Sequence, residues 1–296
     1  MGRDSEVMRK VLLLGGSGYM GKAFNKELVK REYEIYSPSL SHLNYCDFNT
    51  LQQYVESLGG IDFLINAAGF TGKPNVEQCE LRRDETIKGN LILPQMLSHL
   101  AGVNEFRWLQ IGTGCIYEGD NNGKGYTEED EPNFTFKYNN CSFYSGVKGL
   151  AEECLKNDNR CYIARLRIPF NNLNSPRNYI SKLLTYPVTY NNINSLSHIG
   201  DYTRACLDLY EKKCPSGVYN VTNDKWVDTK QVVDLIKRII KPKKHFKYFN
   251  NDKEFYKFAT TPRSNCALNI NKLKSFGISM RSVTDALEDS LLNWQN

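Results

Sequence analysis

A tyrosine and a lysine lie four residues apart in the run Tyr144-Ser-Gly-Val-Lys148. On a helix, residues i and i+4 share one face, so the two side chains would be neighbours. A lysine ammonium beside a phenol favours the phenolate and lowers a tyrosine pKa that is ordinarily about 10. Such a tyrosine can give a proton to a carbonyl oxygen while hydride arrives at the carbon. The spacing alone is common, because a surface lysine near a core-facing tyrosine also produces it.

A threonine and a cysteine follow the strand expected at Phe106–Ile111. The Thr113 hydroxyl would hydrogen-bond the same carbonyl oxygen as Tyr144. Cys115 lies two residues beyond Thr113, and side chains at i and i+2 of a strand point to the same face. A thiol there could exchange the acidic proton beside a ketone. Because free cysteine is often simply a small buried residue, the sequence alone leaves both interpretations of Cys115 open.

A glycine-rich turn, Gly15-Gly-Ser-Gly-Tyr-Met-Gly21, follows an expected strand and opens an expected helix. Gly18 would let the backbone approach a pyrophosphate, and Gly21 would let the helix pack closely on the strand. The free N–H groups of the helix N-terminus would face the phosphates. The pattern predicts a dinucleotide site, and the alternative is a purely structural turn.

The residues expected to contact this dinucleotide lie mainly after the first three strands. They are Gly15, Ser17, Gly18, Tyr19, Met20, Gly21, Ser37, Asp47, Phe48, Ala67, Ala68 and Gly69, together with Tyr144 and Lys148. For Asp47, a helix cap for the segment that begins at Thr50 is the alternative interpretation.

The end of the second expected strand, Glu34–Tyr36, carries no acidic residue to hold a ribose 2′-hydroxyl. This absence removes repulsion against a 2′-phosphate and favours NADPH over NADH. No arginine stands there to bind that phosphate, since Arg31 precedes the strand, so NADH remains possible.

Strand and helix signals alternate through the N-terminal half, which is typical of a parallel sheet covered on both faces. The expected strands are Val11–Leu14, Glu34–Tyr36, Ile61–Ile65, Phe106–Ile111, Cys161–Ile168 and, later, Val218–Val221. The expected helices are Tyr19–Lys30, Leu51–Leu58, one or two within Val76–Leu100 interrupted near Gly89 and Pro94, Tyr144–Leu155, Tyr179–Leu184, Asp201–Tyr210, Thr229–Ile239 and Val283–Trp294. We expect an α/β fold: a Rossmann-type doubly wound parallel sheet in residues 1–168, and a smaller C-terminal substrate-binding lobe in residues 169–296. Some segments of the second part are expected to return to the first.

The chain has 296 residues, of which 41% are hydrophobic and 24% charged, as in ordinary globular proteins. Its net charge of +5 and its short basic run at Lys241–Lys244 are too weak to predict a nucleic-acid partner. Nine cysteines without CxxC spacing indicate a reducing compartment and exclude a disulfide framework or a zinc knuckle. No signal peptide or membrane span is apparent, and we expect neither a metal nor a membrane partner.

Together these motifs resemble the extended short-chain dehydrogenase/reductases along nearly the whole chain. One branch is closer, the nucleotide-rhamnose synthase/epimerase-reductases of plants, and dTDP-4-dehydrorhamnose reductase and GDP-fucose synthase are more distant. The segments that carry this resemblance are Thr71-Gly-Lys-Pro-Asn-Val-Glu-Gln-Cys-Glu80, Gly114-Cys-Ile-Tyr-Glu118, Glu128-Glu-Asp-Glu-Pro-Asn-Phe134, Ser142-Phe-Tyr-Ser145, Pro176-Arg-Asn178 and Thr261-Pro-Arg-Ser-Asn265.

The resemblance implies NADPH, a UDP- or dTDP-linked 4-keto-6-deoxyhexose, a cytoplasmic location and a homodimer. It further implies that Cys115 and Lys182 form an epimerase pair, although an exposed helix charge is the plain alternative for Lys182. Substrate contacts are expected from Asn90, Asn171, Asn172, Arg177, Asn178 and Arg263. Either arginine fits a substrate diphosphate, and either could instead form a surface ion pair.

Three functions follow from these expectations. The first is a bifunctional 3,5-epimerase/4-reductase that converts UDP-4-keto-6-deoxy-D-glucose to UDP-L-rhamnose with NADPH. The second is a monofunctional 4-dehydrorhamnose reductase, and the third is a non-catalytic NADP-binding regulatory subunit. The complete set of Thr113, Tyr144 and Lys148 argues against the third, because a binding subunit has no chemical use for it.

Overall fold

The structure is a computed structural model, and it describes residues 8–295. A six-stranded sheet in the order β2-β1-β3-β4-β5-β9 lies at its centre, and every neighbouring pair is parallel. The strands are β1 (Lys10–Leu14), β2 (Glu34–Tyr36), β3 (Phe63–Asn66), β4 (Arg107–Thr113), β5 (Cys161–Leu166) and β9 (Gly217–Asn220). The expected Rossmann-type α/β fold is confirmed.

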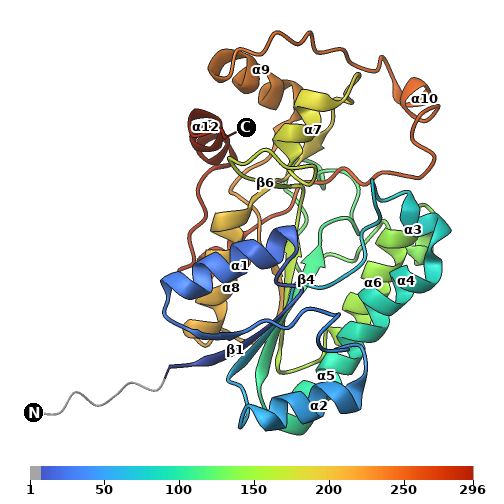
Figure 1. Cartoon of the computed structure of the whole chain (residues 1–296). Coiled ribbons are helices and arrows are strands. Elements are labelled where there is room, and N and C mark those ends of the chain that lie inside the picture. Colours follow the sequence, from blue (N-terminus) through green and yellow to red (C-terminus); the bar gives the residue numbers. More distant parts are fainter. Residues whose placement is uncertain (1–7, 296) are drawn as a thin grey trace, which may run out of the picture.

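Helices cover both faces of this sheet (Figure 1). On one side α1 (Tyr19–Lys30) packs against α8 (Ile199–Glu211), and on the other lie α2 (Phe48–Ser57), α5 (Leu93–Asn104) and α6 (Phe143–Leu155). Side chains of β1 enter both helix-covered cores, because successive side chains of a strand point to opposite faces of the sheet. Leu13 enters the core under α1 and α8, whereas Leu12 and Leu14 enter the core under α2 and α5. This burial on both faces explains why the sequence of β1 is apolar throughout.

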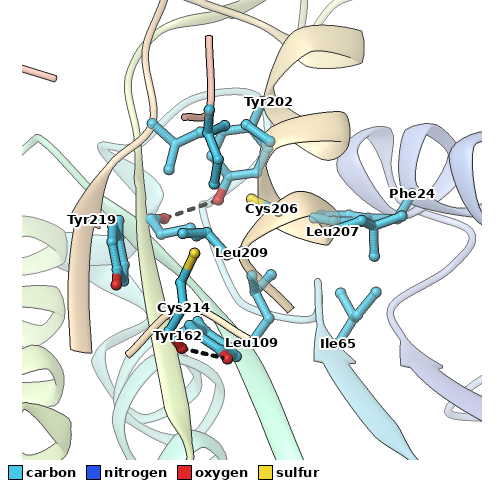
Figure 2. Packing of buried hydrophobic residues seen from close by; sticks show 14 of the residues in the cluster. Phe24, Ile65, Leu109, Tyr162, Tyr202, Cys206, Leu207, Leu209, Cys214 and Tyr219 are labelled. Atoms are coloured by element: carbon cyan, nitrogen blue, oxygen red, sulfur yellow. Dashed lines mark hydrogen bonds between the residues drawn. The ribbon is translucent and has the colours of Figure 1, made fainter. Parts of the chain in front are cut away.

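The core between the sheet and α8 also contains polar groups that are satisfied by the backbone (Figure 2). The Tyr202 hydroxyl of α8 donates to the carbonyl of Ala164 in β5 at 2.9 Å. The Tyr162 hydroxyl donates to the carbonyl of Cys214 at 2.9 Å. Buried hydroxyls of this kind need such partners, and here they fix α8 and the chain after it against β5.

The strand order reverses next to β1, because the chain leaves β1 toward β2 on one side and returns to β3 on the other. Ligands of open α/β sheets bind outside the carboxyl ends of the strands at such a reversal. The glycine turn follows β1, and Ala67–Gly69 follows β3. Both segments therefore flank the position where the fold predicts a ligand.

A smaller lobe lies beyond the carboxyl ends of the strands (Figure 1). Its elements are β6 (Pro169–Phe170), α7 (Tyr179–Thr185), β7 (Ile193–Asn194), β8 (Ser197–His198), β10 (Val227–Asp228), α9 (Thr229–Ile239), α10 (Asp252–Phe255) and α12 (Val283–Leu292). Helices α9 and α12 pack on each other, and the lobe has its own apolar core around Ile180, Val233 and Leu287. A capping box between Asp228 and Gln231 begins α9.

Two segments differ in detail from the expected elements. The segment after residue 76 forms α3 (Gln78–Leu81), α4 (Arg83–Ile87), a π-helical turn (Lys88–Ile92) and α5, so the interruption expected near Gly89 is a π-helical turn. Pro94 lies in the first turn of α5, where its missing N–H costs little. The expected strand near Val218 is β9 of the main sheet, a segment after residue 169 that returns to the first part of the chain.

Other segments complete the described chain. A 3₁₀ turn forms at Phe136–Tyr138, and α11 (Asn271–Ser275) packs on β9. All nine cysteines are free thiols. Within residues 8–295, no helix is long and apolar enough to cross a bilayer, and no group of three or more His, Cys, Asp or Glu side chains could hold a metal ion.

Strand β4 ends at Thr113, a residue of the candidate site, and its Leu109 lies in the core with no exposed surface. We expect Leu109→Ala to lower the free energy of unfolding by about 2–5 kcal/mol, because it leaves a cavity between sheet and helices. Urea unfolding followed by circular dichroism measures this. Leu292→Ala, at a largely exposed leucine, is the matched control and should stay within about 0.5 kcal/mol of the wild type. Equal losses in the two variants would contradict this account of the core.

Candidate functional site

Thr113, Tyr144 and Lys148 meet at the carboxyl end of β4. Thr113 is the last residue of that strand and is buried. Tyr144 and Lys148 lie on the first turns of α6, whose N-terminus is capped by Ser142 accepting the Ser145 N–H at 3.2 Å. The Lys148 ammonium donates to the carbonyl of Ile111 at 2.8 Å, so it is held directly against β4.

Burial controls the charge of this set. It lowers the pKa of Lys148 to about 8, although Glu152 and Cys115 oppose the shift. Burial also raises the pKa of Tyr144 above its ordinary value, while a hydrogen bond with Thr113 works in the opposite direction. The phenol is therefore protonated at neutral pH, as a proton donor to a carbonyl oxygen must be.

Cys115 lies beside Thr113, but for a different reason from the expected one. Strand β4 ends at Thr113, so Cys115 is in the following turn and strand alternation does not apply to it. Instead, the turn closes on itself, because the Cys115 N–H donates to the Thr113 hydroxyl oxygen at 3.1 Å. Cys115 is only partly buried.

Arg167 is a member of this cluster that the sequence patterns did not reveal. It follows β5, and its Nη1 donates to the Cys115 sulfur at 2.9 Å. Its Nη2 donates to the Asn194 side chain and to the carbonyl of Ser264. The available signal was the pair Arg165 and Arg167 at the end of an otherwise apolar strand, since a charge in a buried strand needs a specific partner.

Lys182 lies on α7, whose N-cap is Asn178. Burial lowers the pKa of Lys182, and the positive charges of Arg177 and Arg263 add to this effect. Cys115 acts in the opposite direction, so the thiol and this lysine interact electrostatically. The Cys115/Lys182 epimerase pair itself stays a prediction.

Arg177 and Arg263 extend the positive region around Lys182. An Nη2 of Arg177 donates to the carbonyl of Gly72 at 2.7 Å. An Nη2 of Arg263 forms an ion pair with Glu77 at 2.8 Å, while its Nη1 is buried without a hydrogen-bond partner. The ion pair that was the alternative for Arg263 is therefore present, and each arginine still has donors free for an anionic ligand.

The glycine turn has the geometry that a diphosphate requires. Gly15 has φ +75°, and the Gly18 N–H donates to the Gly15 carbonyl at 3.0 Å. A Cβ at Gly21 would lie 2.1 Å from the Gly15 carbonyl oxygen. No side chain caps α1 at Gly18, which is exposed with Ser17, so its first N–H groups are available to phosphate oxygens.

Other expected cofactor residues are held by the protein itself. The Ser37 hydroxyl donates to the Leu13 carbonyl at 3.0 Å. Asp47 caps α2 by accepting the Thr50 N–H at 2.8 Å, the alternative role considered for it, and these hydrogen bonds lower its pKa. Phe48 packs against His99. Arg31 pairs with acidic residues of α1 and α8, namely Glu27, Asp208 and Glu211, so it is not directed to a 2′-phosphate.

The expected substrate asparagines make contacts within the protein. The Asn90 amide bonds the backbone N–H and carbonyl of Phe70, which fixes the chain after Gly69. Asn171 accepts from the Tyr19 hydroxyl at 3.0 Å and from the buried Asn178 amide at 2.8 Å. Asn172 donates to the carbonyl of Asn293 at 3.1 Å. A direct substrate contact for any of them stays a prediction.

The low pKa of Lys148 gives a pH dependence with a definite sign. Between about pH 8 and its ordinary pKa of about 10.4, the unfolded chain binds this proton and the folded chain does not. Stability of the wild type relative to Lys148→Met should therefore rise by about 2 kcal/mol from pH 8 to pH 10. Urea unfolding at a series of pH values measures the difference. Parallel curves for the two proteins would show that the folded state does not depress this pKa.

Comparisons with known proteins identify relatives of the chain. Residues 8–295 match the family described as RmlD substrate binding domain. A bifunctional dTDP-4-dehydrorhamnose 3,5-epimerase/dTDP-4-dehydrorhamnose reductase of Arabidopsis thaliana is 30% identical, over 93% of this chain and 90% of the relative. The Arabidopsis trifunctional UDP-glucose 4,6-dehydratase/UDP-4-keto-6-deoxy-D-glucose 3,5-epimerase/UDP-4-keto-L-rhamnose-reductase RHM3 is 32% identical over 94% of this chain, which spans only 41% of that relative's length.

Solved structures resemble the chain over almost its full length. The L780 UDP-rhamnose synthase of Acanthamoeba polyphaga mimivirus has a TM-score of 0.88 and 25% identity, covering 97% of this chain and 99% of that one. A dTDP-4-dehydrorhamnose reductase of Bacillus anthracis in complex with NADP shares the fold, with a TM-score of 0.79, 19% identity and 97% of each chain covered. On the family match and the bifunctional relative, the chain belongs to the RmlD substrate binding domain family.

Proposed function

We propose that this chain is an NADPH-dependent 3,5-epimerase/4-reductase that converts UDP-4-keto-6-deoxy-D-glucose to UDP-L-rhamnose. The observation that carries the proposal is the single cluster of Thr113, Tyr144, Lys148 and Cys115, with Lys182 interacting with that thiol. A ketone reductase requires the first three groups only. Cys115 and Lys182 would add a base and an acid, which is what inversion of a carbon next to a ketone requires.

NADPH would be held at the glycine turn, because Gly21 packs closely on Gly15 and no side chain caps the first N–H groups of α1, which can bind a diphosphate. When bound, NADPH would supply the hydride that reaches C4 of the sugar. Thr113 and Tyr144 would hold the C4 oxygen, and Tyr144 would give it the proton. Lys148 would orient the nicotinamide ribose, and its ammonium would favour the resulting phenolate.

Epimerisation would use the same oxygen. Protons at C3 and C5 are acidic because the C4 ketone accepts the electrons of the broken C–H bond and becomes an enolate. Cys115 would take such a proton, and Lys182 would return one to the opposite face of the carbon. The hydrogen-bond donors at Thr113 and Tyr144 would stabilise the negative oxygen during this exchange.

The rest of the substrate suits the positive region of the lobe. Arg177 and Arg263 would bind the diphosphate of a nucleotide sugar, since a guanidinium pairs well with phosphate oxygens. A homodimer would be formed by the helices from α3 to α6, where Leu81, Ile92 and Leu150 are exposed on neighbouring elements. The free thiol of Cys115 requires a reducing compartment, so we place the enzyme in the cytoplasm.

The two half-reactions can be tested separately. The protein is incubated in D₂O with UDP-4-keto-6-deoxyglucose and without NADPH, and deuterium at C3 and C5 is read by NMR. We expect exchange at both carbons in the wild type and at least a hundredfold slower exchange in Cys115→Ala and Lys182→Met.

Reduction of a pre-epimerised UDP-4-keto-rhamnose with NADPH is the control for those variants, which should retain it. Tyr144→Phe should lose that reduction by 10²-fold or more. A wild type that reduces the pre-epimerised sugar without any deuterium uptake would be a monofunctional reductase. A protein that oxidises no NADPH with either sugar would be a binding subunit.

The glycine turn gives a prediction about cofactor affinity. Gly21→Ala should weaken NADPH binding at least tenfold, because the new methyl group would displace the Gly15 carbonyl and with it the turn. Fluorescence titration of NADPH measures the dissociation constant. Gly102→Ala on α5 is the matched control, since a Cβ there meets nothing within 4 Å and should leave affinity unchanged. Equal NADPH affinities of the wild type, Gly21→Ala and Gly102→Ala would show that the turn does not bind the cofactor.

A further inference from the structure

Tyr19 belongs to the glycine turn, but its side chain is bonded to the smaller lobe. It is the first residue of α1, directly after Gly18, so its backbone N–H is one of the groups that the helix itself cannot bond. Its hydroxyl donates to the side-chain oxygen of Asn171, 152 residues further along the chain, at 3.0 Å. Asn171 directly follows β6 and is buried. One residue therefore joins the expected cofactor site to the lobe.

The Asn171 oxygen is bonded in turn to the N-terminus of α7. It accepts the Asn178 amide at 2.8 Å, and the same amide donates to the Asn171 and Leu173 carbonyls at 2.8 and 2.7 Å. The Asn178 side-chain oxygen accepts the Ile180 N–H at 3.0 Å and so caps α7. Asn178 has no exposed surface, and breaking hydrogen bonds in such a place is costly. The position of α7 thus depends on the position of Asn171.

Asn178 stands between two cationic residues that the proposed function assigns to the substrate. Arg177, proposed for the diphosphate, directly precedes it, and its Nη2 donates to the Gly72 carbonyl at 2.7 Å. Lys182, the proposed acid, lies one helical turn later, and its backbone N–H donates to the Asn178 carbonyl at 3.1 Å. A displacement of Asn178 would therefore move both cationic residues relative to the substrate.

The other end of this hydrogen-bonded path is rich in glycine. Four of the seven residues of the turn are glycines, and Ser17 and Gly18 are exposed. Glycine loses more conformational freedom than any other residue when it is fixed, so ordering this segment has a large entropic cost. Phosphate oxygens bound to the first N–H groups of α1 would fix the turn. Tyr19, which lies within it, would be fixed at the same time.

We propose that the Tyr19 hydroxyl is a positioning group that couples the cofactor site to the substrate site through Asn171 and Asn178. This inference rests on the proposed function, which supplies the two ligands. With the turn occupied, Tyr19 holds Asn171 and thereby α7, so Arg177 and Lys182 are already ordered when the nucleotide sugar arrives. The second ligand then loses less conformational freedom on binding and binds more tightly. Because binding free energies are linked, the nucleotide sugar must strengthen cofactor binding by the same factor.

The coupling is measured by isothermal titration calorimetry with UDP, the nucleoside diphosphate of the proposed substrate, without and with saturating NADP⁺. In the wild type we expect UDP to bind about fivefold or more tightly when NADP⁺ is present. The dissociation constant of NADP⁺ should fall by the same factor when UDP is present. Unchanged, weaker or undetectable UDP binding in the presence of NADP⁺ would overturn the proposal without any variant.

Tyr19→Phe removes the hydroxyl and keeps the ring. The Asn171 oxygen still accepts the Asn178 amide and the Leu173 N–H, so no buried acceptor loses its last partner and the variant should fold. We expect the ratio of its UDP dissociation constants without and with NADP⁺ to fall below about twofold, whatever its affinity for either ligand alone. A folded Tyr19→Phe with the wild-type ratio would also overturn the proposal.

Tyr210→Phe is the matched control for this variant. It also removes a tyrosine hydroxyl that joins two elements, because Tyr210 of α8 donates to the Asp62 carbonyl at 3.3 Å. Asp62 directly precedes β3, so this bond lies at the end of the sheet opposite to the candidate site. The coupling ratio of Tyr210→Phe should equal that of the wild type, and a loss equal to that of Tyr19→Phe would overturn the proposed path.

Hydrogen exchange followed by mass spectrometry gives a readout that needs neither UDP nor turnover. NADP⁺ should slow backbone amide exchange at least about twofold in the wild-type peptide that spans residues 171–183. In Tyr19→Phe, NADP⁺ should leave the exchange of this peptide unchanged. Equal slowing in the two proteins would show that the cofactor orders α7 by another route, and the role of Tyr19 would fail.

Activity measurements on the wild type distinguish this inference from the function on which it rests. If NADP⁺ and UDP are coupled through Tyr19 while the sugar shows neither deuterium uptake nor reduction, the coupling stands and the proposed activity fails. If the wild type epimerises and reduces the sugar while NADP⁺ and UDP bind independently, the activity stands and the coupling fails.

Discussion

The parallel pairing of β4 with β5 is the constraint on which the site depends. Thr113 at the end of β4 is paired with Leu166 at the end of β5, so the chain leaves both strands at the same level. The turn with Cys115 and the segment with Arg167 therefore start side by side. Helix α6 then brings Lys148 to the carbonyl of Ile111 in β4. A shift of one residue in this register would turn the side chains of one strand to the opposite face and separate these groups.

The cofactor turn and the lobe are joined by a chain of buried hydrogen bonds. Tyr19 of the glycine turn donates to Asn171, which also accepts from the Asn178 amide. Asn178 in turn caps α7 by accepting the Ile180 N–H, and α7 carries Lys182. The position of the proposed acid is thus linked to the position of the cofactor turn. In a two-step reaction this connection would keep Lys182, the proposed acid of epimerisation, at a fixed position relative to the cofactor that reduces the sugar.

Sequence reasoning identified the fold and the Thr113, Tyr144 and Lys148 cluster because both follow from short-range periodicity. Alternating strand and helix signals predict a parallel sheet, and a four-residue spacing predicts a shared helix face. Cys115 was found through an incorrect strand argument, because where β4 ends depends on long-range pairing. Arg167 was missed since its partner is 52 residues away and no local pattern marks a buried charge without an acid. Asp47 is the opposite case, because its hydrogen bond to the Thr50 N–H caps a helix and a local sequence pattern predicts that role.

The two proposed half-reactions can share one site because both place negative charge on the C4 oxygen. Proton removal at C3 or C5 makes an enolate there, and hydride addition at C4 makes an alkoxide there. Donors directed to that oxygen from Thr113 and Tyr144 would stabilise both states without moving. The surrounding cations favour anionic intermediates, and Glu152, the carboxylate that acts on Lys148, is already paired with Arg165. What distinguishes an epimerase-reductase from a plain reductase is then only a base and an acid placed around an unchanged oxyanion site, the roles proposed here for Cys115 and Lys182.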